Sequence, residues 1–337
     1  MKILNWKEKI NVHELDEVNK CLKSGGLVIF PTETVYGLGA DARNSEAVNN
    51  IFKAKGRAND NPLIVHLDSK SNISKYAEIT NEIEEKLIDA FMPGPFTIIL
   101  KKKDNIPSNV SAGLDTVGIR IPSNEIANTI LYTSGIPIAA PSANVSGRPS
   151  GTNIDDIIQE FDGKVDYIID GDNTDIGLES TVVKVIDNVP TILRPGFITA
   201  EDIMEVIGTV KVSDNIFKKV DGPVESPGMK YKHYAPEAKC ELIYIHSEND
   251  LVNYFKEKST NNTVIIGSSK LKDIPCKKFL NYGDSLISIA HNIFKLLRLA
   301  DTYHPDLILI EGVSKEGLGL AIMNRLIRAC SHNYIER

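Results

Sequence analysis

The sequence predicts an α/β protein of two domains. Helix-type and strand-type apolar patterns alternate over the first two thirds of the 337 residues, and a shorter alternation begins after Glu237. Between them, residues 211–236 show neither periodicity and carry several Pro and Gly residues. We therefore predict a first domain over residues 1–208, an interdomain linker or lid over 209–236, and a second domain over 237–337.

Four helices are expected in the first domain. Ser45 is expected to cap the second of them, and Thr199 to cap a last one that runs to about Ile207. The first three show apolar residues at helical spacing, namely Leu15, Val18 and Leu22, then Val48, Ile51 and Phe52, then Ile83, Leu87 and Phe91.

Short apolar runs between and after these helices predict strands. They lie at residues 27–30, 63–67, 96–100, 117–121, 136–140, 167–169, 181–186 and 191–194. Asp187-Asn188 separates the last two runs and predicts a hairpin. So many strands with intervening helices favour a twisted, mixed sheet.

The second domain shows a simpler pattern. Strands are predicted at 240–245, 263–266 and 307–310, an amphipathic helix through Leu286–Leu297, and a final helix at 321–330. Strands that alternate with helices favour a parallel sheet. We expect a smaller, Rossmann-like α/β domain.

The composition limits the classes of function. The formal net charge is −7 and the pI is near 5.6, which disfavours tight nucleic-acid binding but allows a local basic pocket. No apolar run is long enough for a membrane helix, and the N-terminal segment has no secretory apolar core. The cysteines, Cys21, Cys240, Cys276 and Cys330, show no metal-type spacing. We expect a cytoplasmic protein with reduced thiols.

Several common catalytic motifs are missing from the sequence. There is no Walker-type loop and no Gly-x-Ser-x-Gly motif, and Gly37-Leu38-Gly39 lacks the third glycine of the dinucleotide fingerprint. The seven histidines show no zinc-ligand spacing. An enzyme with this sequence must therefore hold its substrates with other loops.

Four polar clusters follow predicted strands or helices, and ligands of open α/β sheets bind beyond strand ends. Their hydroxyls, glycines and basic side chains could surround an anion. Each cluster alone also fits a simpler structure: a Pro/Gly turn, the solvated end of a helix, or a surface loop. The clusters are residues 31–39, residues 55–62, residues 141–152, and residues 177–181 together with 194–196.

The segment between the domains has an unusual composition. Lys230-Tyr231-Lys232-His233-Tyr234 places basic and aromatic residues side by side. A plain linker is one interpretation, and a lid over a binding site is the other.

In their residues and in their order along the chain, these segments resemble the YrdC-like family of threonylcarbamoyl-AMP synthases, in its longer two-domain form. Residues 226–236, 317–319 and 324–329 match the longer form. The matching segments of the first domain are residues 31–39, 55–57, 62–66, 93–95, 118–122, 140–144, 146–147, 179–181 and 193–196.

The resemblance implies a YrdC-like catalytic domain and a nucleotidyltransferase activity. L-threonine, bicarbonate and ATP would give threonylcarbamoyl-AMP and pyrophosphate, with Mg²⁺ accompanying ATP and no tightly bound organic cofactor. A separate transferase complex, in transient contact at most, would use the product to make threonylcarbamoyladenosine in tRNA. Neither a protein metal site nor a membrane partner is expected.

The resemblance also assigns residues by motif position. Lys55 and Arg57 are expected to be catalytic. L-threonine would be held by Thr34, His66, Arg120, Ala140 and Ser180. ATP would be bound by Arg57, Asn61, Thr116, Ser142, Asn144, Ser150, Arg194 and Tyr234, the last as part of the lid.

The residue types fit these roles. Arg120 can bind a carboxylate with two hydrogen bonds, and the hydroxyls of Thr34 and Ser180 can recognise a hydroxylated side chain. Because no side chain stands out as a covalent nucleophile, we expect catalysis by orientation and charge stabilisation. Two alternatives stay open: a nucleotide- or RNA-binding regulatory module without turnover, and a related carbamoyl-transfer enzyme.

Overall fold

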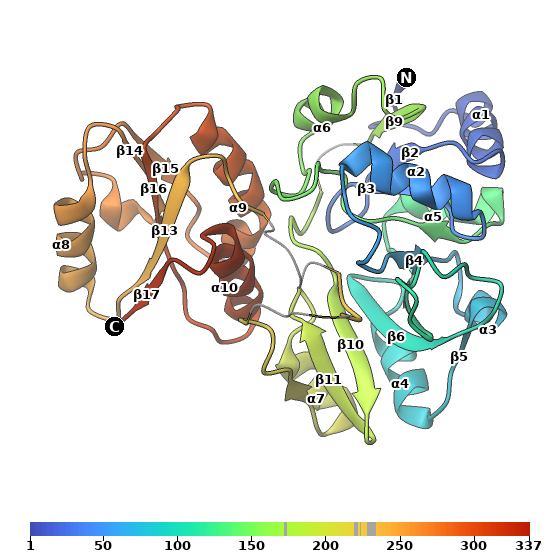
Figure 1. Ribbon diagram of the computed structural model, residues 1–337. Helices are drawn as coiled ribbons and strands as arrows, with labels where there is room; N and C mark the ends of the chain where they lie inside the picture. The colour runs from blue at the N-terminus through green and yellow to red at the C-terminus, as the bar shows by residue number, and fades with distance from the viewer. Residues whose placement is uncertain (172–173, 219–221, 223, 228–233) are drawn as a thin grey trace. The chain divides into compact units, whose positions relative to one another are not determined.

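The computed structural model describes residues 1–171, 174–218, 222, 224–227 and 234–337. The chain divides into two units, and each has its own sheet (Figure 1). Unit 1 comprises Met1–Ser146, Gly151–Asp175 and Glu179–Lys230, and unit 2 comprises Gly147–Ser150, Ile176–Leu178 and Tyr231–Arg337. The predicted α/β fold class is confirmed.

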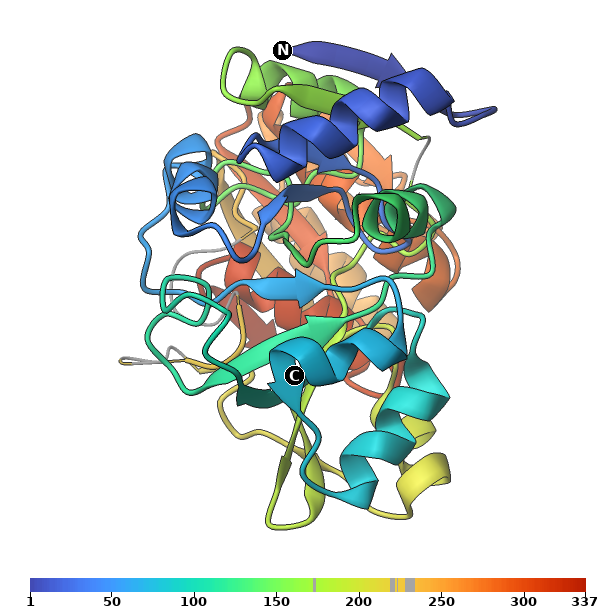
Figure 2. The ribbon, with the colours of Figure 1, turned by 90° about the vertical axis from the view of Figure 1, so that its right-hand side faces the viewer.

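Unit 1 is built on one mixed sheet. Its described strands are β1 (Lys2–Asn5), β2 (Val28–Phe30), β3 (Gly37–Asp41), β4 (Ile64–His66), β5 (Ala77–Glu78), β6 (Phe96–Lys102), β7 (Thr116–Arg120), β8 (Ile138–Ala139), β9 (Tyr167–Asp170), β10 (Thr181–Ile186), β11 (Val189–Arg194) and β12 (Lys211–Val212). Their order is β1-β9-β2-β3-β8-β4-β7-β6-β10-β11-β12, with β5 paired to β6. Figures 1 and 2 show the sheet of this unit running from β1 and β9 at the top to the β10–β11 hairpin at the bottom.

Asparagine begins most of the helices of unit 1. The side chains of Asn11, Asn44, Asn81, Asn124 and Asn153 accept backbone N–H bonds and so cap α1, α2, α4, α5 and α6. The prediction that Ser45 caps the second helix is therefore wrong by one residue, because Asn44 accepts from the N–H groups of Glu46 and Ala47. The helices are α1 (Val12–Lys23), α2 (Ser45–Lys55), η1 (Lys70–Asn72), α3 (Ile73–Tyr76), α4 (Glu82–Phe91), α5 (Glu125–Ser134), α6 (Ile154–Phe161) and α7 (Ala200–Ile207), which Thr199 caps as predicted.

The two faces of this sheet are covered differently. On one face, residues of α2, α4, α6 and α7 close an apolar core that contains Val65, Ile98 and Ile119. On the other face, α1 and α5 pack on an apolar cluster with Phe30 and Ile138, from strands at the β1–β8 end of the sheet. Successive residues of a strand point to opposite faces. His66 and Arg120, next to core residues Val65 and Ile119, therefore lie on the second face, beyond the cover of α1 and α5.

The hairpin that the sequence predicts is confirmed. β10 pairs antiparallel with β11, from Ile186 opposite Val189 back to Val182 opposite Arg194. Asp187 and Asn188 both have positive φ, at 50° and 61°, as a two-residue type I′ turn requires. The hairpin thus brings Arg194 back to the start of β10.

Unit 2 is a second, smaller α/β layer structure. Its strand order is β15-β14-β16-β13-β17, and every neighbouring pair is parallel, which confirms the predicted parallel sheet. Figure 1 shows α8 on one face of this sheet and α9 and α10 on the other. The elements are β13 (Lys239–Tyr244), α8 (Glu248–Lys258), β14 (Thr263–Gly267), η2 (Ser269–Leu271), β15 (Lys278–Asn281), α9 (Leu286–Asp301), β16 (Leu307–Glu311), α10 (Leu318–Ala329) and β17 (Tyr334–Glu336).

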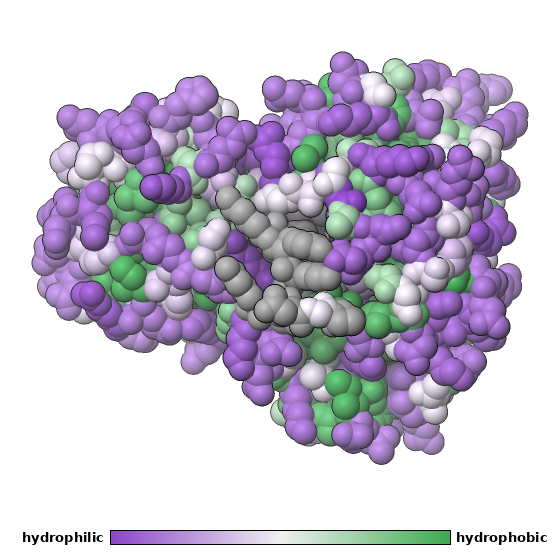
Figure 3. Space-filling view, in the orientation of Figure 1, coloured by the Kyte–Doolittle hydropathy of each residue, from purple (hydrophilic) through white to green (hydrophobic). Residues whose placement is uncertain are grey.

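The surface of the described residues is mostly polar. Figure 3 shows apolar residues on the visible face only in separate small patches, one of them over the β10–β11 hairpin and α7, where Ile186, Met204 and Val206 are exposed. Among the helices of the described residues, none has the length and apolar character that crossing a membrane demands. All four cysteines are free thiols.

Candidate active site

Carboxyl ends of some strands and amino ends of others meet at one edge of the sheet of unit 1. β4 and β7 run parallel and end together at His66 and Arg120, and β6 and β10 begin there because Thr181 pairs with Phe96. A bridge between Gly37 and Ser142 adds the start of β3 and the segment after β8. The carboxyl ends of some strands and the amino ends of others therefore surround one region, which we call the strand-end site.

A buried ion pair lies at the centre of the strand-end site. Nη2 of Arg120 donates to Oε1 of Glu33 over 2.7 Å, and both side chains are only 5% exposed. Nε of Arg120 and Oε2 of Glu33 are buried without a hydrogen-bond partner in the described part of the chain. Buried polar atoms normally have partners, so this pair retains one donor and one acceptor for a ligand.

His66 lies beside this pair. It is opposite Arg120 in the parallel register of β4 and β7, and its Nδ1 is buried without a partner among the described residues. Burial, followed by the charge of Arg120, lowers the pKa of His66 to about 3. The imidazole is therefore neutral at physiological pH, and one of its nitrogens can accept a hydrogen bond from a ligand.

A turn after β2 presents Thr34. The hydroxyl of Thr32 donates to the carbonyl oxygen of Val35 over 2.6 Å and lies 2.8 Å from the hydroxyl of Thr34. Since the single proton of Thr32 is used, Thr34 donates to Thr32 and keeps its own lone pairs. Ala140 lies nearby, where a Cβ on Gly37 would come within 3.3 Å of its methyl group. These small residues leave room at the strand ends.

Ser180 and Arg194 form a second buried cluster. Arg194 donates through Nε and Nη2 to the carbonyl oxygen of Ser180, at 3.1 and 2.9 Å, and through Nη2 to its hydroxyl. That hydroxyl also lies 2.8 Å from the hydroxyl of Thr97 on β6. The hairpin thus places Arg194 next to Ser180, two residues that the sequence analysis groups in one cluster.

Lys55 is buried rather than at a solvated helix end. It is 2% exposed, and its ammonium group donates to the carbonyl oxygens of Ser142 and of Asn144, the latter over 2.7 Å. The hydroxyl of Ser142 in turn donates to Oδ1 of Asn144 over 2.6 Å. Lys55 therefore ties the loop after β8 to the end of α2 and adds a positive charge beneath it.

Arg57 and Asn61 follow α2 in sequence. Nη2 of Arg57 donates to the carbonyl oxygen of Asn61 over 3.3 Å, and the guanidinium carbon lies 6.0 Å from the centre of the Phe52 ring. Asn61 is fully buried, and both polar atoms of its side chain lack a hydrogen-bond partner in the described residues. An unsatisfied buried amide is costly, which makes Asn61 a strong candidate for a ligand contact.

Thr116 lies at the other end of β7 from Arg120. Its hydroxyl donates to Oε1 of Glu225 over 2.8 Å, and Lys184 on β10 donates to the same carboxylate at 2.7 and 2.9 Å. Glu225 belongs to the segment between the predicted domains, so these contacts fasten that segment to the sheet. We call the three residues the Glu225 clasp.

Ser150 and Tyr234 belong to unit 2. Tyr234 is 3% exposed, and its ring stacks on Phe294 with centroids 5.1 Å apart. The guanidinium of Arg325 lies 5.7 Å from the centre of the same ring. Residues 228–233, which complete the predicted lid, lie outside the described residues, so the roles of Ser150 and Tyr234 stay predictions.

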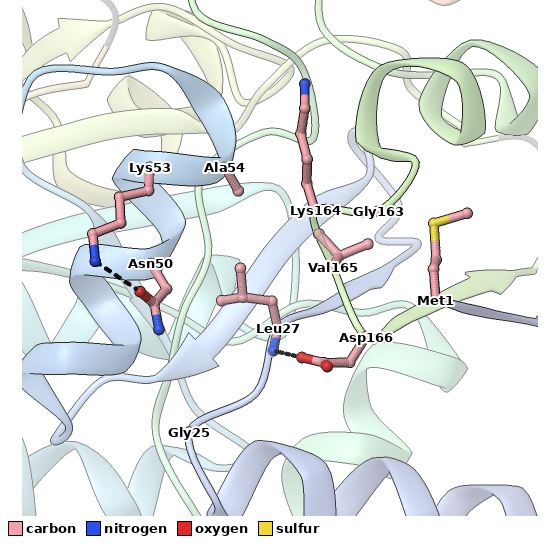
Figure 4. Close-up of a pocket in the computed structure, with 10 residues that line it drawn as sticks. All are labelled: Met1, Gly25, Leu27, Asn50, Lys53, Ala54, Gly163, Lys164, Val165 and Asp166. Carbon is pink, nitrogen blue, oxygen red and sulfur yellow. Dashed lines mark hydrogen bonds between the residues drawn. The ribbon is translucent and has the colours of Figure 1, made fainter.

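A separate cavity of unit 1 lies at the opposite edge of the sheet. It measures about 490 Å³, and Figure 4 shows Met1, Leu27 and Asp166 in its lining, with a hydrogen bond from the N–H of Leu27 to Asp166. Met1, Leu27 and Asp166 directly precede β1, β2 and β9. None of the predicted substrate residues lines this cavity, so it is distinct from the strand-end site.

The strand-end site is positively charged. Lys55, Arg120 and Arg194 contribute to it, and the carboxylate of Glu33 offsets one of these charges. Sequence reasoning missed Glu33 and Thr97 as site residues. Glu33 is within the segment 31–39 that the sequence singles out, but its partner Arg120 is 87 positions away, and no local signal links them. Such a site can bind anions and small hydroxylated molecules.

Comparison with known protein families gives two consecutive matches. Residues 20–196 match the family described as "Telomere recombination" (Sua5, YciO and YrdC), and residues 198–331 match "Threonylcarbamoyl-AMP synthase, C-terminal domain". The two matches meet at residues 196–198, just before the start of α7.

Full-length relatives are also similar. The threonylcarbamoyl-AMP synthase of Pyrococcus abyssi is 42% identical over 342 residues that cover 99% of each chain. That of Bacillus subtilis is 39% identical and covers 96% of this chain and 95% of its own. The crystal structure of P. abyssi Sua5 complexed with L-threonine superposes with a TM-score of 0.94 at 40% identity, with full coverage of both chains.

Proposed function

This chain belongs to the two-domain threonylcarbamoyl-AMP synthases, which are nucleotidyltransferases of tRNA threonylcarbamoyladenosine synthesis, and we propose that its strand-end site joins L-threonine, bicarbonate and ATP. The observation that carries the assignment is the buried Arg120–Glu33 pair beside a neutral His66. It offers a cationic donor, an acceptor and a neutral ring within one small region. An α-amino acid presents the complementary groups.

Threonine is held at the centre of the site. Its carboxylate binds Nε of Arg120, which lacks a partner among the described residues, and Glu33 keeps the guanidinium in place. The hydroxyl oxygen of Thr34 and the hydroxyl of Ser180 form hydrogen bonds with the polar groups of the substrate. Ala140 bounds the space for the side chain. A substrate without the hydroxyl leaves these buried groups unpaired, which is the basis of selection against it.

ATP is held by the basic and amide groups around it. Arg57 and Arg194 neutralise the phosphates, and Lys55 fixes the loop that presents Ser142 and Asn144. The unpartnered amide of Asn61 contacts the nucleotide. By their motif positions alone, Thr116, Ser150 and Tyr234 are also assigned to ATP.

The reaction proceeds by orientation and charge stabilisation. The threonine amine attacks the carbon of bicarbonate, a C–N bond forms and water leaves, which gives a carbamate. A carbamate oxygen then attacks the α-phosphorus of ATP, and the bond to pyrophosphate breaks. Arg57 and Arg194 stabilise the negative charge that develops on the leaving pyrophosphate. Neutral His66 keeps one acceptor nitrogen besides its single N–H, so it can accept a hydrogen bond from the substrate.

Mg²⁺ enters with ATP as part of the substrate. Mg²⁺ prefers oxygen ligands and usually keeps several waters while it bridges phosphates. The buried side chains of the strand-end site are cationic, hydroxyl or amide groups and the neutral imidazole of His66, and the carboxylate among them, Glu33, already pairs with Arg120. This donor set fits a magnesium ion held by phosphate oxygens and water.

Pyrophosphate release tests the proposed function. The purified chain should release pyrophosphate only when L-threonine, bicarbonate and ATP are all present, and mass spectrometry should detect threonylcarbamoyl-AMP. L-serine tests the recognition of the threonine methyl group, and L-valine tests that of the hydroxyl. An equal rate with serine, valine or no amino acid would disprove the threonine assignment.

A further inference from the structure

Unit 2 contains a cavity of its own, at the carboxyl ends of its parallel strands. It measures about 560 Å³, within the range of pockets that hold small ligands. Its lining follows the ends of four strands: His246 after β13, Ser268 after β14, Tyr282 after β15, and Gly312 after β16. None of these residues belongs to the strand-end site.

The cavity lies where the sheet changes its direction of winding. β13 and β16 are neighbours, but the chain leaves β13 for α8 and leaves β16 for α10, which cover opposite faces (Figure 1). Leu251 and Phe255 of α8 pack in a cluster with Ile265 and Leu309, whereas α10 packs beside α9. Open α/β sheets bind ligands in the crevice at such a point.

A buried carboxylate faces this cavity. Glu311, the last residue of β16, is 6% exposed, and its Oε2 accepts the N–H of Ser268 over 2.6 Å. Burial raises the pKa of Tyr282, and the neighbouring charge of Glu311, together with a side-chain hydrogen bond to it, raises this pKa further. A Cβ on Gly267 would lie 2.9 Å from Oε2, so the glycine leaves space for the carboxylate. Two bonds leave a carboxylate with further capacity to accept.

A second polar atom in the lining lacks a partner. The hydroxyl oxygen of Ser268 is buried and makes no hydrogen bond to any described residue. Because buried hydroxyls are normally bonded, this atom independently indicates a polar ligand. It adjoins the N–H group that Glu311 binds.

The charge of the lining favours a neutral ligand. Lys270 and Glu248 lie 3.6 Å apart and offset each other, which leaves the carboxylates of Asp284 and Glu311. Two negative charges disfavour phosphates and carboxylates and favour hydroxyl donors. Ile245, Leu251, Leu286 and Ile289 give the cavity an apolar part of its wall, beside polar residues such as Ser269, Ser285 and Ser314, and this apolar part can pack against a flat heterocycle.

We propose that unit 2 binds a neutral nucleoside in this cavity. The ribose hydroxyls donate to Glu311 and meet the hydroxyl of Ser268, and the base lies against the apolar wall. This site is separate from the nucleotide site of unit 1, and the negative lining distinguishes a nucleoside from ATP. It gives unit 2 a ligand of its own.

Titration calorimetry with adenosine tests the proposal on the full chain, held at saturating ATP so that the strand-end site is occupied. Wild type should bind adenosine, and 2′-deoxyadenosine and AMP should bind at least tenfold more weakly. Glu311→Gln should weaken adenosine at least tenfold and leave ATP binding within twofold. The matched control Glu257→Gln, at an exposed position of α8 outside the lining of the cavity, should bind adenosine as wild type does.

A second variant covers the case in which Glu311→Gln fails to fold. Ser269→Trp places bulk at an exposed position of the lining and should also abolish adenosine binding. The proposal is overturned if wild type binds no adenosine at saturating ATP. It is equally overturned if Ser269→Trp, or a folded Glu311→Gln, binds adenosine as wild type does.

Discussion

Arg120 and Glu33 form a buried ion pair, with Nη2 of the arginine 2.7 Å from Oε1 of the carboxylate and each side chain 5% exposed. Such a pair adds little net stability over an apolar pair, but loss of one partner leaves an uncompensated buried charge. The pair is therefore better understood as a device that holds a guanidinium in a fixed position. Its remaining donor, Nε, is then available to a substrate carboxylate.

Removal of the carboxylate should expose this role. Glu33→Ala should lower the free energy of unfolding by about 3–5 kcal/mol and raise the KM for threonine, because Arg120 loses its anchor. Urea unfolding and initial rates measure the two effects. Glu17→Ala, which breaks the exposed pair with Lys2, is the matched control and should change little. Equal stabilities of the two variants would contradict this role.

His66 should make stability depend on pH. Its pKa falls from 6.5 to about 3 on folding, so below pH 6.5 the unfolded chain binds a proton that the folded chain does not. The contribution of His66 to stability is thus fully present above pH 6.5 and declines as the pH falls towards 3. At pH 5 the loss is about 2 kcal/mol.

Urea unfolding at pH 7.5 and pH 5 measures this dependence. In His66→Asn the drop in stability between the two values should shrink by about that amount, since no group titrates at this position. The exposed His13→Asn should keep the wild-type drop. An undiminished drop in His66→Asn would show that this histidine does not remain neutral in the folded state.

Lys55 should matter more than its helical neighbour. Lys55→Met removes the hydrogen bonds to Ser142 and Asn144 and a charge near the phosphates, so kcat/KM for ATP should fall about 100-fold or more. Lys53→Met, at an exposed position of the same helix, should retain wild-type rates. Steady-state kinetics compare the two, and a Lys55→Met enzyme of near wild-type activity would exclude both the structural and the electrostatic role.

The Glu225 clasp should control the segment that follows unit 1. Glu225→Ala breaks the contacts to Thr116 and Lys184, so trypsin should cleave between residues 211 and 236 faster than in wild type, and the KM for ATP should rise more than that for threonine. Asp214→Ala, at an exposed position of the same segment, serves as the control. If both variants are cleaved at the wild-type rate, the clasp does not fasten the segment.

Some regular elements with apolar patterns could be predicted from the sequence, whereas the amphipathic helices α5 and α6 are not among the predicted elements. β10, β11 and α7 are found at the expected residues because a hairpin signal and a capping threonine frame them. β3 was not expected, because its sequence Gly-Leu-Gly-Ala-Asp lacks β-branched residues. Tertiary pairing with β2 and β8 forms this strand. β12 is too short and too exposed to leave a pattern.

The types of the site residues and their order along the chain could be predicted from the sequence, but the contacts between them could not. The types and order of the site residues matched a known family, whereas their partners come from distant positions. Lys55 shows the difference: on the sequence it resembles a solvated helix end, yet the loop after β8 buries it. Only the register of the sheet brings these segments together, and a single sequence carries no direct sign of that register.

Titration calorimetry of the two substrates tests the central claim most directly, namely that Arg120 serves threonine and Arg57 serves ATP within one site. Arg120→Ala should lose threonine binding at least tenfold and keep the ATP affinity within twofold, and Arg57→Ala should show the reverse. If both variants lose both ligands equally, the proposed division of the strand-end site is contradicted.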